Sequence, residues 1–397
     1  MNRLNSVARR VAKWGLRRSI WRDAVYRPSL ADRPHYIRLD VTNYCNQLCI
    51  KCFVPAAMRR EPAHAMALED YRALAEKLFP YAYLLQLPCA YEGLMHPRFP
   101  DLIRIADQYK IPNIGIVTNG VLLKGERAGA LLESSNVTAV SVSIDALAED
   151  VYRVMRGRPG AAAVLDNVAR FIELKRRGGR RNLHLKFNVL IARSNAADLP
   201  ALTRWAVDHG VDEIEFFHVE PMSEDNEELL LNEPGAYDRL HEELGMILAG
   251  TGLRVYLPPP DGSGAAAPSR HTQDEPGSRF DTSESNALDP RYSHPYPTHT
   301  FCINPWMVLQ IDSRGDMYPC GHRLHLGPFA NILRQERDEA LNSFAIMRLR
   351  HEHLTGRVDE ECHRCRSRTP CADPMRRRQV RMLTEDLERI AMDEKPF

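Results

Sequence analysis

Three cysteines near residue 50 are the residues in this chain best suited to carry chemistry. Cys45, Cys49 and Cys52 are separated by three and by two residues. Three thiolates at this spacing can bind three corners of a cubane iron–sulfur cluster, whereas a closed cluster or a structural zinc site normally takes four protein ligands. One iron would then keep a position open for a non-protein ligand. The alternative is a zinc site completed by a distant histidine such as His64.

A second set of cysteines occupies the last hundred residues, and Cys89 stands alone between the two sets. Its members are Cys302, Cys320, Cys362, Cys365 and Cys371. In a reducing cytoplasm such clustering indicates metal ligation more than disulfide bonding.

Repeated strand and helix patterns position the first cysteine group. From residue 36 onward, short β-branched runs alternate with helical patterns, which is typical of βα units around a parallel sheet. The six expected strands are Tyr36 to Val41, Tyr83 to Leu87, Asn113 to Val117, Ala139 to Ile144, His184 to Ile191 and Glu213 to His218. The expected helices include Leu68 to Phe79, Phe99 to Tyr109, Ala161 to Arg177 and Leu199 to His209.

The fold class that follows is α/β, a partial (β/α)6 TIM-like barrel. Its first strand leads directly into the cysteine loop, so the three thiols lie at the carboxyl end of a barrel strand, where the active sites of such barrels are built.

Composition limits the other possibilities. The chain has 397 residues, a formal net charge of +1 and 26% charged residues. This balance favours a globular protein and gives no reason to expect a nucleic-acid partner. No apolar run approaches the roughly 20 residues of a transmembrane helix, and we expect a cytoplasmic protein without a transmembrane segment.

Changes in pattern along the chain suggest five segments. They are a basic amphipathic N-terminal segment (1–35), the barrel (36–257), a flexible insertion rich in Pro, Ser and Gly (258–300), a small cysteine-rich domain (301–375) and a C-terminal helix (376–397). A hairpin is expected near the start of the cysteine-rich domain, with strands around Trp306 to Ile311 and Met317 to Pro319.

The first cysteine motif, on its strand, resembles that of the radical S-adenosylmethionine (radical SAM) superfamily. The resemblance covers residues 36 to about 220. Further segments match in the family's order: Glu92 in the position of its Gly-Gly-Glu-Pro segment, then Thr118-Asn119-Gly120 and Ser141 to Asp145. The resemblance implies a [4Fe-4S] cluster whose open iron chelates SAM, and reductive cleavage of SAM to a 5′-deoxyadenosyl radical that abstracts hydrogen.

The same resemblance implies four SAM contacts. Glu92 would receive the amino group of SAM, and Asn119, Ser143 and Asn188 would contact its polar groups. For Ser143 and Asn188 ordinary hydrogen bonding within the strands is an equal alternative, and Asn119 can equally serve as a turn residue.

The C-terminal cysteines resemble the auxiliary-cluster region of the SPASM and twitch branches of this superfamily. That resemblance implies one further [4Fe-4S] cluster, held by Cys302, Cys320, Cys362 and Cys365, with Cys371 as an open substitute. Structural zinc is the alternative for the same thiolates. A second auxiliary cluster is not expected, because Met375 occupies the position of the next family cysteine.

The reaction class remains open between two outcomes. With the auxiliary cluster as electron acceptor, the substrate radical would be oxidised by two electrons, as in a dehydrogenase. With Cys89 or Cys371 as hydrogen donor, the enzyme would be an epimerase; a packed Cys89 is the plainer alternative.

We expect a polar small-molecule substrate, such as a sugar, aminocyclitol or aminoglycoside of natural-product biosynthesis. Only residues 1–35 precede the barrel, less than the leader-binding domain that peptide-modifying members often carry. The electron donor would be a protein such as flavodoxin or ferredoxin. A peptide-modifying maturase and a non-catalytic zinc protein are the remaining alternatives.

Overall fold

The structure is a computed structural model. It describes residues 35–52, 54, 57–218, 231, 235–257, 302, 304–354, 359 and 362. The expected N-terminal segment except for His35, the insertion at 258–300, the C-terminal helix, Cys365 and Cys371 lie outside the described residues.

A single sheet of ten strands forms the centre of the described part of the chain, in the order β10-β9-β8-β1-β2-β3-β4-β5-β6-β7. Neighbouring strands from β1 to β7 pair in parallel. The bounds are β1 His35–Leu39, β2 Ala82–Leu87, β3 Asn113–Thr118, β4 Val137–Ser143, β5 His184–Ile191, β6 Glu213–His218, β7 Arg254–Tyr256, β8 Val308–Ile311, β9 Asp316–Tyr318 and β10 Ala330–Asn331. The α/β class and the barrel-like parallel sheet are therefore confirmed.

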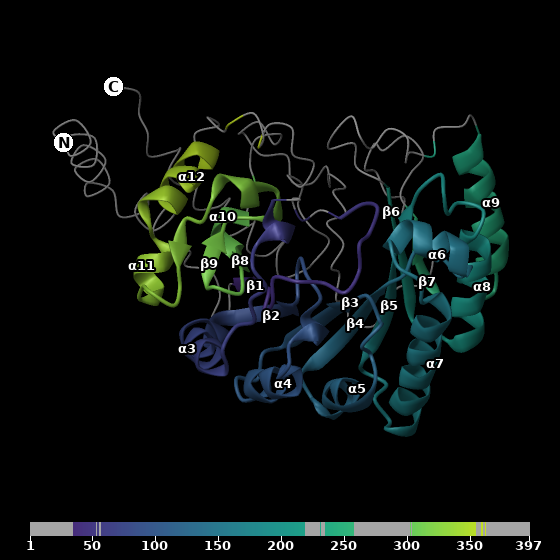
Figure 1. Cartoon of the computed structure of the whole chain (residues 1–397), viewed down its shortest axis with the longest axis horizontal. Helices are drawn as coiled ribbons and strands as arrows, with labels where there is room; N and C mark the ends of the chain where they lie inside the picture. Colours follow the sequence, from purple (N-terminus) through teal and green to yellow (C-terminus); the bar gives the residue numbers. More distant parts are fainter. Residues whose placement is uncertain are drawn as a thin grey trace, which may run out of the picture.

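Helices cover the outer side of this sheet (Figure 1). The α-helices are α3 Leu68–Leu78, α4 Phe99–Asp107, α5 Gly125–Glu133, α6 Glu149–Arg156, α7 Ala161–Arg177, α8 Leu199–His209, α9 Ala236–Leu248, α10 Asn304–Met307, α11 Arg337–Leu341 and α12 Phe344–Leu354. Short 3-10 helices are η1 Met58–Arg60, η2 Phe79–Tyr81, η3 Gly93–Met95 and η6 Gly321–Leu326. No described helix is long and apolar enough to cross a bilayer.

Alternate residues of the strands pack against these helices. On β5, Leu185, Phe187 and Val189 are buried in the main hydrophobic core, and the Phe187 ring stacks on Trp205 of α8 with centroids 5.9 Å apart. Because successive side chains of a strand point to opposite faces, the residues between them face the inside of the barrel.

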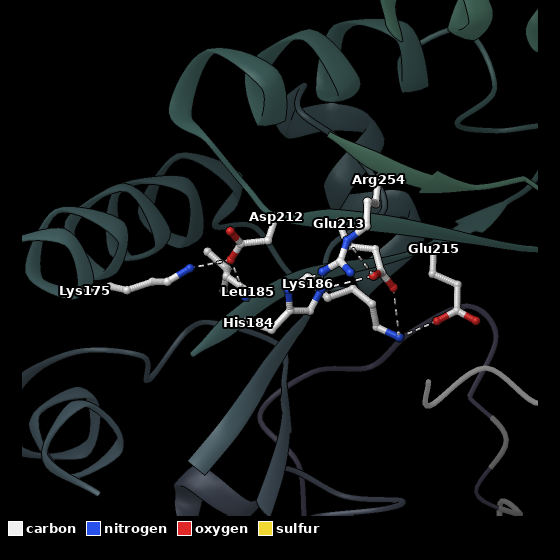
Figure 2. A network of polar contacts seen from close by, with 8 residues as sticks. All are labelled: Lys175, His184, Leu185, Lys186, Asp212, Glu213, Glu215 and Arg254. Carbon is white, nitrogen blue, oxygen red and sulfur yellow. Dashed lines mark hydrogen bonds and ion pairs between the residues drawn. The ribbon is translucent and has the colours of Figure 1, made fainter. Parts of the chain in front are cut away.

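An ion pair connects α7 with Asp212, the residue before β6 (Figure 2). Lys175 of α7 pairs with Asp212, whose carboxylate also accepts a hydrogen bond from the Leu185 backbone N–H (2.7 Å).

The expected hairpin near residue 310 is present, but its place in the fold differs from the expectation. Strand β8 pairs in parallel with β1, and β9 pairs with β8 in antiparallel orientation. The cysteine-rich region thus begins inside the barrel sheet. All six expected strands are present as β1 to β6. The sheet also includes β7, which has only three residues, and β8, which reaches the edge of β1 from far along the chain. Trp306, expected in the hairpin, belongs to α10 and is buried.

Candidate active site

The cysteine loop follows β1 at the carboxyl end of the sheet and rests on the last turn of α6. The backbone N–H groups of Leu48 and Ile50 donate to the carbonyl oxygens of Arg156 and Met155, each at 3.0 Å. Carbonyls in the last turn of a helix have no partner inside the helix. The loop supplies that partner, and α6 fixes the loop backbone on both sides of Cys49.

Gly157 allows the loop to approach α6 this closely. It ends the helix with φ +70°, a left-handed conformation that favours glycine. A Cβ at this position would overlap the carbonyl oxygen of Leu48. Any other residue here would push the cysteine loop away from the helix.

Glu92 is buried beside the cysteine loop, and three donors from two segments hold its carboxylate. Thr118 Oγ1 donates to its Oε1 (2.8 Å), the Asn119 backbone N–H donates to Oε2 (2.7 Å), and the Leu94 backbone N–H donates to Oε1 (3.2 Å). Burial raises the pKa of Glu92 to about 7, although these donors favour the carboxylate.

Asn119 connects Glu92 with the first cysteine. Its side-chain Nδ2 donates to Asn46 Oδ1 (2.5 Å) and lies 3.8 Å from Cys45 Sγ. The structure thus brings together Cys45, Glu92 and Asn119, which lie far apart in the sequence. It also gives Asn119 a turn role, since its Oδ1 accepts a hydrogen bond from the Val121 backbone N–H (3.1 Å).

Arg156 is a site residue that sequence reasoning missed. Its Nε lies 2.8 Å from Asp145 Oδ2 in a buried ion pair, and its Nη1 lies 3.8 Å from Cys49 Sγ. Burial disfavours the charge of Arg156, but Asp145, Cys49 and Tyr152 together outweigh this effect and raise the pKa of Arg156. A positive charge at Cys49 stabilises a thiolate ligand. The sequence feature that could have indicated this role is an arginine at the end of the helix that follows the segment Ser141 to Asp145.

Asp40, the residue after β1, holds the loop that leads to Glu92. One oxygen, Oδ1, accepts three backbone hydrogen bonds, from Cys89 (3.0 Å), Ala90 (2.7 Å) and Tyr91 (3.2 Å). Burial raises the pKa of Asp40 to about 6 against the effect of these donors. Sequence reasoning missed this role as well.

Gln310 of β8, in the cysteine-rich region, adds a further contact to Asp40. Its Nε2 donates to Asp40 Oδ2 (3.3 Å), and the Cys89 thiol donates to its Oε1 (3.1 Å). Cys89 therefore sits at the mouth of the barrel with its thiol hydrogen-bonded, and its use as a hydrogen donor stays a prediction.

Ser143 and Asn188 are register partners on β4 and β5, and Asn188 is paired in turn with Glu215 on β6. All three face the inside of the barrel, because the intervening residues belong to the core. Asn188 Oδ1 is buried and accepts no hydrogen bond among the described residues. Buried polar atoms normally have a partner, so this oxygen is available to a bound ligand.

Charged side chains continue along the inner face below this layer (Figure 2). Lys186 pairs with Glu215 and lies 4.0 Å from Glu213. Oε2 of Glu213 lies 3.1 Å from His184 Nε2 and 3.7 Å from Arg254 Nε. A barrel interior is ordinarily filled by branched apolar residues, so this wall is unusually polar.

The second cysteine set is described in part. Cys302, Cys320 and Cys362 are half-buried, and Cys362 Sγ accepts a hydrogen bond from Arg323 Nη1 (3.0 Å). Arg323 also pairs with Asp359 at 2.7 Å. Since Cys365 and Cys371 lie outside the described residues, the auxiliary ligand set stays a prediction.

The first cysteine group fits a cluster with three protein ligands. Its thiols are free and at least partly accessible, and N–H donors lie beside Cys45 and Cys49. Burial raises the pKa of the Cys45 thiol to about 11, so cluster assembly must displace its proton. His64 bonds Ser313 (3.0 Å), and no three His, Cys, Asp or Glu side chains in the described ranges converge on a single-ion site.

Two family models match the chain. The radical SAM superfamily model matches residues 39–206, and the SPASM iron–sulfur cluster-binding domain model matches residues 302–366.

Curated relatives match with identities of 25% and 28%. A tungsten-containing aldehyde ferredoxin oxidoreductase cofactor-modifying protein of Pyrococcus furiosus is 28% identical over 182 residues, 45% of this chain and 49% of that protein. A GTP 3′,8-cyclase of Erythrobacter litoralis is 25% identical over 304 residues, 74% of this chain and 82% of that protein. The chain therefore spans about half the length of the Pyrococcus relative.

Among solved structures, Streptococcus suis SuiB bound to S-adenosylmethionine aligns with a TM-score of 0.60. The sequences are 14% identical, and the alignment covers 81% of this chain and 68% of SuiB. At this identity the likeness shows a shared fold alone.

Proposed function

Because this chain belongs to the radical SAM superfamily and carries a C-terminal SPASM iron–sulfur cluster-binding domain, we propose that it cleaves SAM reductively and oxidises a polar small molecule. Cys45, Cys49 and Cys52 would hold the [4Fe-4S] cluster. When bound, this cluster supplies the electron that cleaves SAM and generates the radical that abstracts hydrogen.

The convergence of Glu92, Asn119 and Cys45 is the observation that carries the proposal. The Glu92 carboxylate is fixed by three donors and lies, through Asn119, beside a cluster ligand. An acceptor in this place suits the N–H donors of the amino group of SAM. Asp40 positions the loop of Glu92, and Arg156 balances negative charge at Cys49.

The polar inner wall supports a polar substrate. Ser143, Asn188 and Glu215 form one layer across three strands, and Lys186 holds the Glu215 carboxylate. A buried ion pair is weak evidence for stability, because apolar residues of similar size often stabilise a core as well or better. Hydroxyl and amino groups of a sugar or aminocyclitol would find both donors and acceptors on this wall.

Two-electron oxidation is the proposed outcome. The substrate would lose a hydrogen atom to the radical, and then a proton and an electron, leaving a carbonyl where a hydroxyl carbon stood. The auxiliary cluster is the proposed electron acceptor. Gln310 supports a link between the two regions, because it connects β8 to Asp40 and the loop of Glu92.

The test is anaerobic incubation of the reconstituted enzyme with SAM, dithionite and a panel of aminocyclitols and amino sugars in deuterated buffer. A product lighter by two hydrogens, formed with 5′-deoxyadenosine, supports dehydrogenation. Deuterium in a product of unchanged oxidation state assigns epimerisation instead. Absence of 5′-deoxyadenosine from an iron-loaded enzyme rejects the proposed function.

A further inference from the structure

Two proposed ligands of the auxiliary cluster come from segments that lie far apart in the sequence. Cys320 directly precedes η6, whereas Cys362 lies beyond α12. Arg323 of η6 connects the two segments, because its Nη1 lies 3.0 Å from Cys362 Sγ and 2.7 Å from Asp359 Oδ2. A guanidinium Nη1 carries two hydrogens, so it can donate one to each acceptor. Arg323 therefore donates a charge-assisted hydrogen bond to the sulfur of a proposed cluster ligand.

Asp359 holds this contact from the other side. Its Oδ1 accepts a hydrogen bond from the Cys362 backbone N–H (3.0 Å), while its Oδ2 pairs with Arg323. The direction of the N–H···S contact is thus fixed at both ends. The side chain of Asp359 is 42% exposed and that of Arg323 only 14%. Because solvent screens the more exposed carboxylate, the acid offsets the charge of the arginine only in part.

An arginine paired with an aspartate lies beside each cysteine group, but the two contacts differ in length. Arg156 Nη1 lies 3.8 Å from Cys49 Sγ, and Arg323 Nη1 lies 3.0 Å from Cys362 Sγ. Net charge and hydrogen bonds to the sulfurs set the reduction potential of an iron–sulfur cluster. A cationic donor favours the reduced state, which is the more negative one. The closer donor should therefore raise the potential on the auxiliary side more.

We propose that Arg323 is a positioning residue that acts through Cys362 Sγ to raise the reduction potential of the auxiliary cluster, which makes the cluster a better electron acceptor. The inference rests on the proposed function, since it concerns the acceptor of the same reaction. In the step concerned, the substrate radical loses a proton from its hydroxyl group to water and one electron to the oxidised cluster, and a carbonyl forms.

The experiment measures the midpoint potential of the auxiliary cluster alone. The background is the full chain with Cys45→Ala, Cys49→Ala and Cys52→Ala, which lacks the proposed ligands of the first cluster. The remaining iron–sulfur signal then belongs to the auxiliary cluster. A redox titration followed by electron paramagnetic resonance gives its potential, and iron, sulfide and zinc analysis gives its occupancy.

Four variants in this background separate a redox role from a purely structural one. Arg323→Met removes both the donor and the charge, and Arg323→Lys keeps the charge. Asp359→Asn removes the acid but keeps an oxygen that can accept the Cys362 N–H. The matched control is Arg334→Met, an exposed arginine that follows β10.

The expected shifts have opposite signs. Arg323→Met should lower the equilibrium constant for reduction about tenfold, which is about 59 mV for a one-electron couple, and Arg323→Lys should restore part of this loss. Asp359→Asn should raise the potential, because Arg323 keeps its charge and loses its counter-ion. Arg334→Met should leave the potential unchanged. A contact that only holds the fold would lower iron content in both Arg323→Met and Asp359→Asn without opposite shifts in potential.

Several outcomes overturn this role of Arg323. An unchanged potential in Arg323→Met at normal iron content does so, as does an equal shift in Arg334→Met. Loss of iron in Arg323→Met, with unchanged potentials in Arg323→Lys and Asp359→Asn, assigns the arginine to the fold alone. Zinc in place of iron rejects the auxiliary cluster itself. Failure of the enzyme with all its cysteines to cleave SAM with dithionite rejects the proposed function, while the potentials still decide the role of Arg323.

Discussion

Replacing Glu92 with glutamine tests how the site binds SAM. The carboxylate accepts from Thr118 and Leu94 at Oε1 and from Asn119 at Oε2. Glutamine keeps one accepting oxygen but turns an NH2 group toward the Asn119 N–H. The hydrogen bond from the amino group of SAM would also lose its charged acceptor, and a hydrogen bond to a charged group contributes about 1.5–3 kcal/mol to binding. We therefore expect the Kd for SAM to rise about 10- to 150-fold.

The stability of the wild type relative to this variant depends on pH, because Glu92 is buried on folding. The pKa of Glu92 rises from its ordinary 4.5 to about 7 on folding. The folded chain then binds more protons than the unfolded chain between these values, so the stability associated with this group is present below pH 4.5 and is lost as the pH rises through 7. At about 1.4 kcal/mol per pKa unit, the full change is about 3.5 kcal/mol.

The assay has two parts. Titration calorimetry of the iron-loaded enzyme gives the SAM affinity, and urea unfolding of the apoprotein at pH 5 and pH 8 gives the stability. From pH 5 to pH 8 the glutamine variant should gain about 2.5 kcal/mol relative to the wild type, since it lacks the ionisable group. Glu126→Gln, at an exposed position of α5, is the control for both parts. Unchanged SAM affinity together with a pH-independent stability difference would refute this reasoning.

Three further variants probe the rest of the site. Gly157→Ala should reduce iron incorporation, because its Cβ overlaps the cysteine-loop backbone; Gly179→Ala, also at positive φ but in open space, should leave iron content unchanged. Arg156→Gln leaves Asp145 buried without its cation and should destabilise the apoprotein by about 3–5 kcal/mol in urea unfolding; a loss below about 1 kcal/mol contradicts the paired geometry. Cys365→Ala should spare SAM cleavage more than product formation, and equal loss of both speaks against an electron-accepting auxiliary cluster.

Local sequence patterns predicted the barrel strands well. Strands β5 and β6 and helices α7 and α8 begin and end at the expected residues, because alternating burial and clear end signals such as Gly210 mark them. The cysteine loop was predicted from its spacing and its place after a strand, whereas Glu92 and Asn119 were predicted from the resemblance to the radical SAM family. The structure brings them together because the carboxyl ends of parallel strands meet at one edge of the sheet.

Contacts between distant segments could not be predicted in the same way. Arg156 reaches Cys49 only because α6 folds back onto the cysteine loop, and Asp40 meets Gln310 only because β8 pairs with β1. Neither contact leaves a periodic pattern in the sequence. Sequence patterns assigned no role to Asp40 and indicated Asp145 only as the end of a matching family segment; their burial and partners show what they hold.

Electron paramagnetic resonance of the reduced, anaerobically reconstituted enzyme tests the central claim most directly. If Cys45, Cys49 and Cys52 leave one iron of a [4Fe-4S] cluster open, adding SAM should change the g-values of that cluster, and Cys45→Ala should abolish the change. A spectrum that SAM leaves unaltered, or a preparation that holds zinc in place of iron, would contradict the account.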